Sequence, residues 1–136
     1  MGTFDRYFIE GLKTLWGLKE NQTLEVFYRK VRNKVGKEYE YPVARIKQKG
    51  KKVQYRHLSQ AVLDASKEIR QRGAIRLLKK DLVRLADLIQ ELEYLVEEIK
   101  EHRKVIEELP EELKKEMETL SNSLKELGES LNLREE

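Results

Sequence analysis

The stretch from Ala74 to Glu108, AIRLLKKDLVRLADLIQELEYLVEEIKEHRKVIEE, carries the longest regular pattern in the chain. Its apolar residues recur at alternating spacings of three and four, as in a helix that presents one apolar stripe to a partner helix. At 1.5 Å per residue, such a helix is about 50 Å long. The stretch therefore predicts a coiled-coil-like helix, with a stripe of Ile75, Leu78, Leu82, Leu85, Ile89, Leu92, Val96 and Ile99.

A second apolar stripe follows a short link at Leu109-Pro110-Glu111-Glu112. Proline at the first helical position and acids in the first turn favour a helix start, and a short link between two such helices predicts an antiparallel hairpin. The second helix is too short to cover the whole first stripe, whose remainder must meet the sheet, the first helix or another copy of the chain. We predict a homodimer in which the oligomerisation residues are Ile75, Leu78, Leu82, Leu85 and Ile89.

One stripe position carries a charge instead of an apolar side chain. Arg103 lies between Ile99 and Ile106, and a charge facing a partner helix is costly unless it is paired. The hairpin places Arg103 opposite the start of the second helix. We therefore predict an ion pair between Arg103 and an acid there, Glu111, Glu112 or Glu116.

Residues 24–57 change to a period of two, which is typical of strands. Three runs rich in Val, Tyr, Phe and Ile, residues 24–32, 38–47 and 51–57, are separated by turn sequences that each contain a glycine. They predict a three-stranded antiparallel meander. Pro42 lacks an N–H and predicts an edge position or a bulge.

Helices are expected on both sides of the meander. Residues 3–16 form an amphipathic pattern with Thr3 as N-cap and Gly17 as the stop. Ser59 fits the N-cap of a helix over 60–72 that Gly73 ends or bends. The chain is thus predicted to be α+β and mostly α, divided into an N-terminal amphipathic helix (1–21), a basic meander plus helix (22–73) and an acidic helical hairpin (74–136).

Charge is distributed unevenly beneath a net charge of +3. Residues 22–57 hold 11 Lys and Arg against 3 Asp and Glu, whereas residues 81–136 hold 8 against 17. The Lys- and Glu-rich composition, with few Gln and Asn, is common in proteins of hyperthermophiles. A basic middle and an acidic tail indicate interaction surfaces of opposite sign.

The sequence offers little for catalysis. It has no cysteine, and its two histidines, His57 and His102, are not in a metal-ligand spacing. The glycines at Gly36-Lys37 and Gly50-Lys51 belong to turns and not to a phosphate-binding loop. We expect no enzyme activity, no cofactor, no metal site, no signal peptide and no membrane span. The expected location is the host cytoplasm or a virion.

The meander carries the strongest functional signal. Lys and Arg neutralise phosphates, and tyrosine stacks on bases, so a one-sign patch with four tyrosines predicts nucleic-acid binding, with DNA favoured. Two alternatives remain: the lysines keep sheet edges soluble and the tyrosines are core, or the patch meets an acidic protein partner or the acidic hairpin. The predicted nucleic-acid-binding residues are Arg29, Lys30, Arg32, Lys34, Lys37, Arg45, Lys47, Lys49, Lys51, Lys52 and Arg56.

The sequences FYRK (27–30), GKEYEY (36–41) and GKKVQYRHL (50–58) resemble a Gly-x-x-Tyr-x-Tyr meander of uncharacterised prokaryotic and mobile-element proteins. They also resemble the N-terminal arm-binding domains of phage and archaeal-virus tyrosine recombinases, over about residues 22–72. That resemblance implies DNA contact by the sheet without strand exchange, because a recombinase catalytic domain does not fit. The implied contact residues are Arg29, Lys30, Arg32, Arg45, Lys47, Lys51, Lys52 and Arg56.

Taken together, these patterns predict a small nucleic-acid-binding accessory protein of a virus or other mobile element of a thermophile. It would bind the phosphate backbone through the meander and dimerise through its helices. The alternative is a structural or protein-interaction bundle without a nucleic-acid role.

Overall fold

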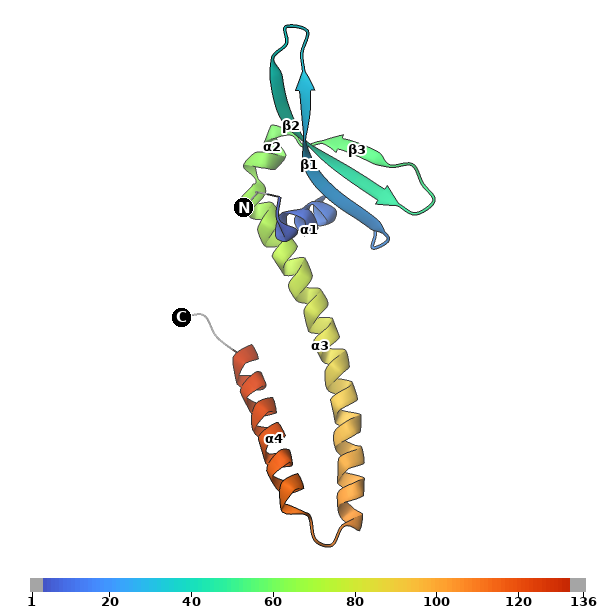
Figure 1. Cartoon of the computed structure of the whole chain (residues 1–136), viewed down its shortest axis with the longest axis vertical. Coiled ribbons are helices and arrows are strands. Elements are labelled where there is room, and N and C mark those ends of the chain that lie inside the picture. Colours follow the sequence, from blue (N-terminus) through green and yellow to red (C-terminus); the bar gives the residue numbers. More distant parts are fainter. Residues whose placement is uncertain (1–3, 133–136) are drawn as a thin grey trace. The chain divides into compact units, whose positions relative to one another are not determined.

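The computed structural model describes residues 4–132 and forms two compact units, one ending at Ala86 and the other beginning at Asp87. The predicted α+β class, mostly helical with a three-stranded antiparallel sheet, is confirmed (Figure 1). In chain order the elements are α1 (Arg6–Leu15), β1 (Gln22–Arg32), β2 (Glu38–Gln48), β3 (Gln54–His57), α2 (Gln60–Asp64), α3 (Ser66–Val105) and α4 (Glu111–Leu131).

The sheet is a meander in the order β1-β2-β3, and both pairings are antiparallel. β1 and β2 pair along their full lengths, from Gln22 opposite Gln48 to Arg32 opposite Glu38, but β3 pairs only with residues 43–46 of β2. The outer half of the β1–β2 hairpin therefore extends beyond β3 as a two-stranded ribbon (Figure 1). Its turn is closed by Asn33, whose Oδ1 accepts the N–H groups of Val35 and Lys37 at 3.0 and 2.9 Å.

Pro42 lies in the central strand, at the point where β2 loses its second neighbour. Its carbonyl accepts the N–H of Leu58 at 3.2 Å, so the Pro42 nitrogen also points toward the β3 edge, where β3 has already ended. Because proline has no N–H, it cannot donate the return bond, and the β2–β3 ladder stops at this point. The prediction of an edge position or a bulge is wrong, because β2 is the central strand and its register with β1 continues through Pro42 without a bulge.

The core lies between one face of the sheet, α1 and the start of α3. Strand alternation points Leu24, Ala44 and Ile46 to this face. Phe8 and Leu12 of α1 are fully buried against them, and Leu58 and Ile69 complete the cluster. One face of the sheet is thus committed to packing.

Both ends of α1 have identifiable caps. The predicted N-cap, Thr3, lies outside the described residues; α1 instead begins after Asp5, whose carboxylate accepts the N–H of Phe8 at 3.0 Å. Gly17 adopts a φ of 63° beyond the helix end, and the following N–H, of Leu18, donates to the carbonyl of Lys13 at 2.9 Å. This Schellman-type closure confirms Gly17 as the stop.

The helix after the meander is interrupted earlier than predicted. Ser59 caps α2, and its hydroxyl accepts the N–H of Val62 at 3.2 Å as expected. The interruption falls at Ala65, and α3 then continues through Gly73 without a break. The prediction that Gly73 ends the helix is wrong, because this glycine serves close packing: a Cβ there would lie 1.8 Å from the carbonyl oxygen of Tyr7.

The second unit contains the end of α3, a short link and α4, and the predicted helical hairpin is confirmed (Figure 1). Pro110 is the N-cap of α4 and not its first helical residue. The apolar stripes of both helices stay 40–67% exposed, so they are not closed against each other: Leu92, Val96, Ile99, Leu113, Met117, Leu120, Leu124, Leu127 and Leu131. Across residues 4–132, no helix combines the length and apolar character that a membrane span requires.

Candidate nucleic-acid interface

Five of the eleven predicted basic residues lie in the turns of the meander. Lys34 and Lys37 lie in the β1–β2 turn, and Lys49, Lys51 and Lys52 lie in the β2–β3 turn. All five are exposed. The ion pairs between residues 4 and 132 involve other cations, so these lysines have no carboxylate partner in that part of the chain. They form the cationic ends of the sheet.

Three further basic residues share the face that carries α1. Across the β1–β2 pair, the Arg32 guanidinium donates a hydrogen bond to the Glu38 carboxylate at 2.8 Å. The Lys30 ammonium lies 3.7 Å from a carboxylate oxygen of Glu40. The guanidinium of Arg56 lies 5.0 Å from the ring centroid of Trp16. Because these cations already have partners within the chain, they are poorer candidates for phosphate contact than the turn lysines.

The remaining three basic residues, Arg29, Arg45 and Lys47, lie on the opposite face, which we call the open face. Arg45 pairs with Glu25, and this hydrogen bond holds the pKa of the Glu25 carboxyl below its ordinary value. The Lys47 ammonium lies 3.7 Å from the same carboxylate. Arg29 lies over the ring of Tyr55, with 5.2 Å between the guanidinium carbon and the centroid.

Aromatic rings gather on the open face. Tyr39 and Tyr41 lie 6.3 Å apart, and Tyr41 stacks on His57 at 4.8 Å with an interplanar angle of 10°. Val43 is only 1% exposed yet does not belong to the core cluster, so it is covered by its neighbours on this face. Tyr39 and Tyr55 keep 48% and 52% of their surface exposed.

The fourth meander tyrosine, Tyr28, lies on the other face. Its ring packs 5.3 Å from that of Phe4. Alternation within β2 places Tyr39 and Tyr41 on one side already from the sequence. The register with β3 is what adds Tyr55 and His57 to them and separates Tyr28 from the group. Sequence reasoning treated His57 as an isolated histidine and missed this cluster.

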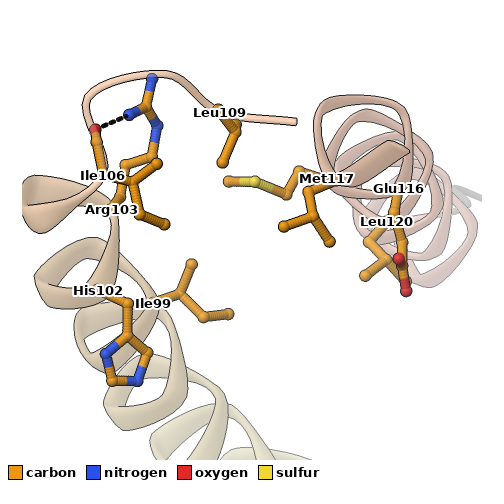
Figure 2. Close-up of a pocket in the computed structure, with 9 residues that line it drawn as sticks. Ile99, His102, Arg103, Ile106, Leu109, Glu116, Met117 and Leu120 are labelled. Carbon is orange, nitrogen blue, oxygen red and sulfur yellow. Dashed lines mark hydrogen bonds between the residues drawn. The ribbon is translucent and has the colours of Figure 1, made fainter. Parts of the chain in front are cut away.

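The hairpin contains a separate apolar groove of about 280 Å³ near the link between α3 and α4. Figure 2 shows Ile99, Ile106, Leu109 and Met117 pointing into it. The predicted ion pair of Arg103 is wrong: its guanidinium donates to the carbonyl oxygen of Ile106 at 3.3 Å (Figure 2). The carbonyl lies only three residues away, so the side chain reaches it without crossing to α4. No three His, Cys, Asp or Glu within residues 4–132 are arranged to hold a metal ion.

The predicted oligomerisation residues lie along one side of α3 in both units. Ile75, Leu78, Leu82 and Ile89 are 45–57% exposed, and Leu85 is half-buried. The exposed members form an apolar stripe along α3.

Comparison with known proteins gives no further guide. No family model matches the chain, and neither a curated protein nor a solved structure matches it. The resemblance to recombinase arm-binding domains therefore stays a prediction, and the functional argument depends on the chemistry of the surfaces.

Proposed function

We propose that this chain is a nucleic-acid-binding accessory protein whose meander contacts the phosphate backbone and whose helices form a homodimer. The observation that carries the proposal is the set of five exposed turn lysines without a carboxylate partner among the described residues. Unpaired cations release counterions from nucleic acid on binding, and this gain does not require breaking an internal ion pair. The resemblance to meanders of mobile elements and the Lys- and Glu-rich composition favour a virus or mobile element of a thermophile.

The two turns suit contacts with a backbone because they lie at opposite ends of β2. Lys37 precedes β2 and Lys49 follows it. At about 3.3 Å per residue, an eleven-residue strand spans roughly 35 Å, and one duplex strand places a phosphate about every 3.4 Å of axis. Cations at both ends therefore reach several phosphates at once.

The test is a fluorescence-anisotropy titration of the full chain against duplex DNA at several salt concentrations. Five phosphate contacts predict a slope of log K against log salt of about −4 to −5. The double variant Lys34→Ala/Lys37→Ala should flatten the slope by about two units, and the triple variant at Lys49, Lys51 and Lys52 by about three. These turns lie outside the core, so the fold should be retained.

The matched control is Lys115→Ala/Lys125→Ala in α4, which removes two exposed positive charges outside the meander. If net charge alone attracts nucleic acid, this variant will weaken binding as much as Lys34→Ala/Lys37→Ala. The proposal requires the turn variant to lose much more affinity for DNA than this control. Absence of any nucleic-acid binding by the wild-type protein at about 50 mM salt, where the electrostatic term is strong, would refute it.

Dimerisation is supported by the open stripe of α3. Burying an apolar side chain completely is worth about 1.5–3 kcal/mol, so each half-exposed stripe residue would contribute about 1 kcal/mol on association. Leu82→Glu places a charge on the stripe and should give a monomer by light scattering at micromolar concentration. The control Val83→Glu changes an adjacent, 64% exposed residue that points away from the stripe. A monomeric wild-type protein would refute this part of the proposal.

A further inference from the structure

We propose that the open face of the sheet is a stacking platform for single-stranded nucleic acid; this inference rests on the proposed function and specifies its ligand. Strand register, and not sequence proximity, brings the rings of Tyr39, Tyr41, Tyr55 and His57 to this face. The packing face, by contrast, is occupied by α1 and the core cluster. The open face therefore presents aromatic side chains whose exposed surfaces are not used for packing.

Tyr39 and Tyr55 present exposed ring surface that a base can reach. Tyr39 and Tyr55 are about half exposed, although their strands are rigidly paired in the sheet. Tyr41 is held by its stack on His57 at 4.8 Å. Rings fixed on a sheet lose little conformational freedom when a base stacks on them, and base–aromatic stacking is favourable for every base because each has a π-face.

The spacing of the rings favours unpaired strands. Tyr39 and Tyr41 are two residues apart on one strand, with ring centroids 6.3 Å apart. Bases within a duplex strand are stacked at about 3.4 Å, and their faces are covered by neighbouring bases. A base must leave the stack to reach a protein ring, which a single strand allows at little cost.

Cations accompany the rings along β2. Arg45 and Lys47 lie on the open face in the same alternation as Tyr39 and Tyr41, and the turn residues Lys37 and Lys49 directly precede and follow β2. Arg29 adds a positive charge directly over the ring of Tyr55. Glu25, the acid on this face of β1, is neutralised by Arg45 and Lys47. The open face thus combines π-faces with positive charge, as single-strand binding requires.

The experiment compares fluorescently labelled twelve-nucleotide oligo(dT) and oligo(U) with a twelve-base-pair duplex, using the full chain. The wild-type protein should bind a single strand about tenfold or more tightly than the duplex. Tyr39→Ala and Tyr55→Ala should each weaken single-strand binding by about 5- to 150-fold. Neither should change the salt slope, because no charge is removed. Tyr39→Phe should restore binding, because the ring and not the hydroxyl makes the contact.

Tyr28→Ala is the matched control. Tyr28 belongs to the same β1–β2 ribbon and is 55% exposed, but it lies on the opposite face. It should leave single-strand binding unchanged. If Tyr28→Ala weakens binding as much as Tyr39→Ala, the rings act through the fold and the platform is refuted.

The remaining outcomes separate the two proposals. Equal affinity for single strand and duplex, with both tyrosine variants unchanged, would overturn the platform while leaving phosphate binding by the turns intact. Failure of the wild-type protein to bind any of the three probes at about 50 mM salt would overturn both. Preference between the DNA and RNA strands is reported by the two single-stranded probes.

Discussion

The close crossing of α1 and α3 depends on two glycines, and replacing one of them tests how closely the two helices pack in the first unit. A Cβ on Gly73 would lie 1.8 Å from the carbonyl oxygen of Tyr7, and one on Gly11 would lie 1.9 Å from that of Ile69. Both neighbours are backbone atoms and cannot rotate away. Gly73→Ala therefore forces the two helices apart by more than about 1 Å, since nonbonded carbon contacts have their optimum near 3.5–4.0 Å.

The size of the effect follows from two opposing contributions. Alanine gains about 1 kcal/mol over glycine in a helix interior. Overpacking costs about 1–3 kcal/mol and occasionally more, and the depth of this clash, against backbone, puts it at the upper end. Helices parted by about 1 Å also lose about half of the attraction of each contact. We expect a net loss of about 2–3 kcal/mol, or roughly 10–20 °C in the Tm of a domain of this size.

The assay is denaturation followed by the fluorescence of Trp16, the single tryptophan, which lies at the C-cap of α1. Gly128→Ala in α4 is the matched control, because nothing lies within 4 Å of the added Cβ. It should stabilise its helix by about 0.5–1 kcal/mol and leave the Trp16 transition in place. A Gly73→Ala protein as stable as wild type would refute the close crossing.

The two glycines should also be coupled. Once Gly73→Ala has separated the helices, the added Cβ of Gly11→Ala clashes less. The double variant should therefore lose less stability than the sum of the losses of the two single variants. Strict additivity would mean that the two sites do not share one helix crossing.

Two further predictions concern charged groups. Hydrogen bonds from Arg70, and to a lesser extent from the Phe8 N–H, hold the pKa of Asp5 below its ordinary value. The native state thus favours the carboxylate. This stabilisation is complete above about pH 4 and is lost as the pH falls through the lowered pKa. Asp5→Asn should lower the free energy of unfolding at pH 7 and make the loss of stability in acid shallower. Denaturation followed by Trp16 fluorescence at several pH values measures both effects. An unchanged dependence of stability on pH in acid would contradict this prediction. Arg103→Leu should leave hairpin stability unchanged or raise it by up to about 1 kcal/mol, because Arg103 donates only to the Ile106 carbonyl and leucine adds apolar surface to the groove. A thermal melt by circular dichroism measures this, and a Tm drop of several degrees would show that the bond to Ile106 matters.

Local periodicity was enough to predict most elements of this protein, but not the break at Ala65 between α2 and α3. Alternation over residues 24–57 and the three-four spacing from Ile75 onward depend only on which side of a strand or helix each residue occupies. The glycine turns and the Ser59 cap likewise depend on neighbouring residues, and the structure has them where the sequence placed them. The concentration of positive charge in residues 22–57 is also a property of the sequence alone.

Only the tertiary structure decided which residues meet. A glycine inside a helical pattern signals a break when neighbours are considered alone, whereas Gly73 is required by the backbone of Tyr7, 66 residues away in the chain. The division of eleven basic residues among two faces and two turns, and the gathering of Tyr39, Tyr41, Tyr55 and His57, follow from the register between strands. Register and helix crossings are set by the fit of distant surfaces, and that fit is not encoded in any one window of the sequence.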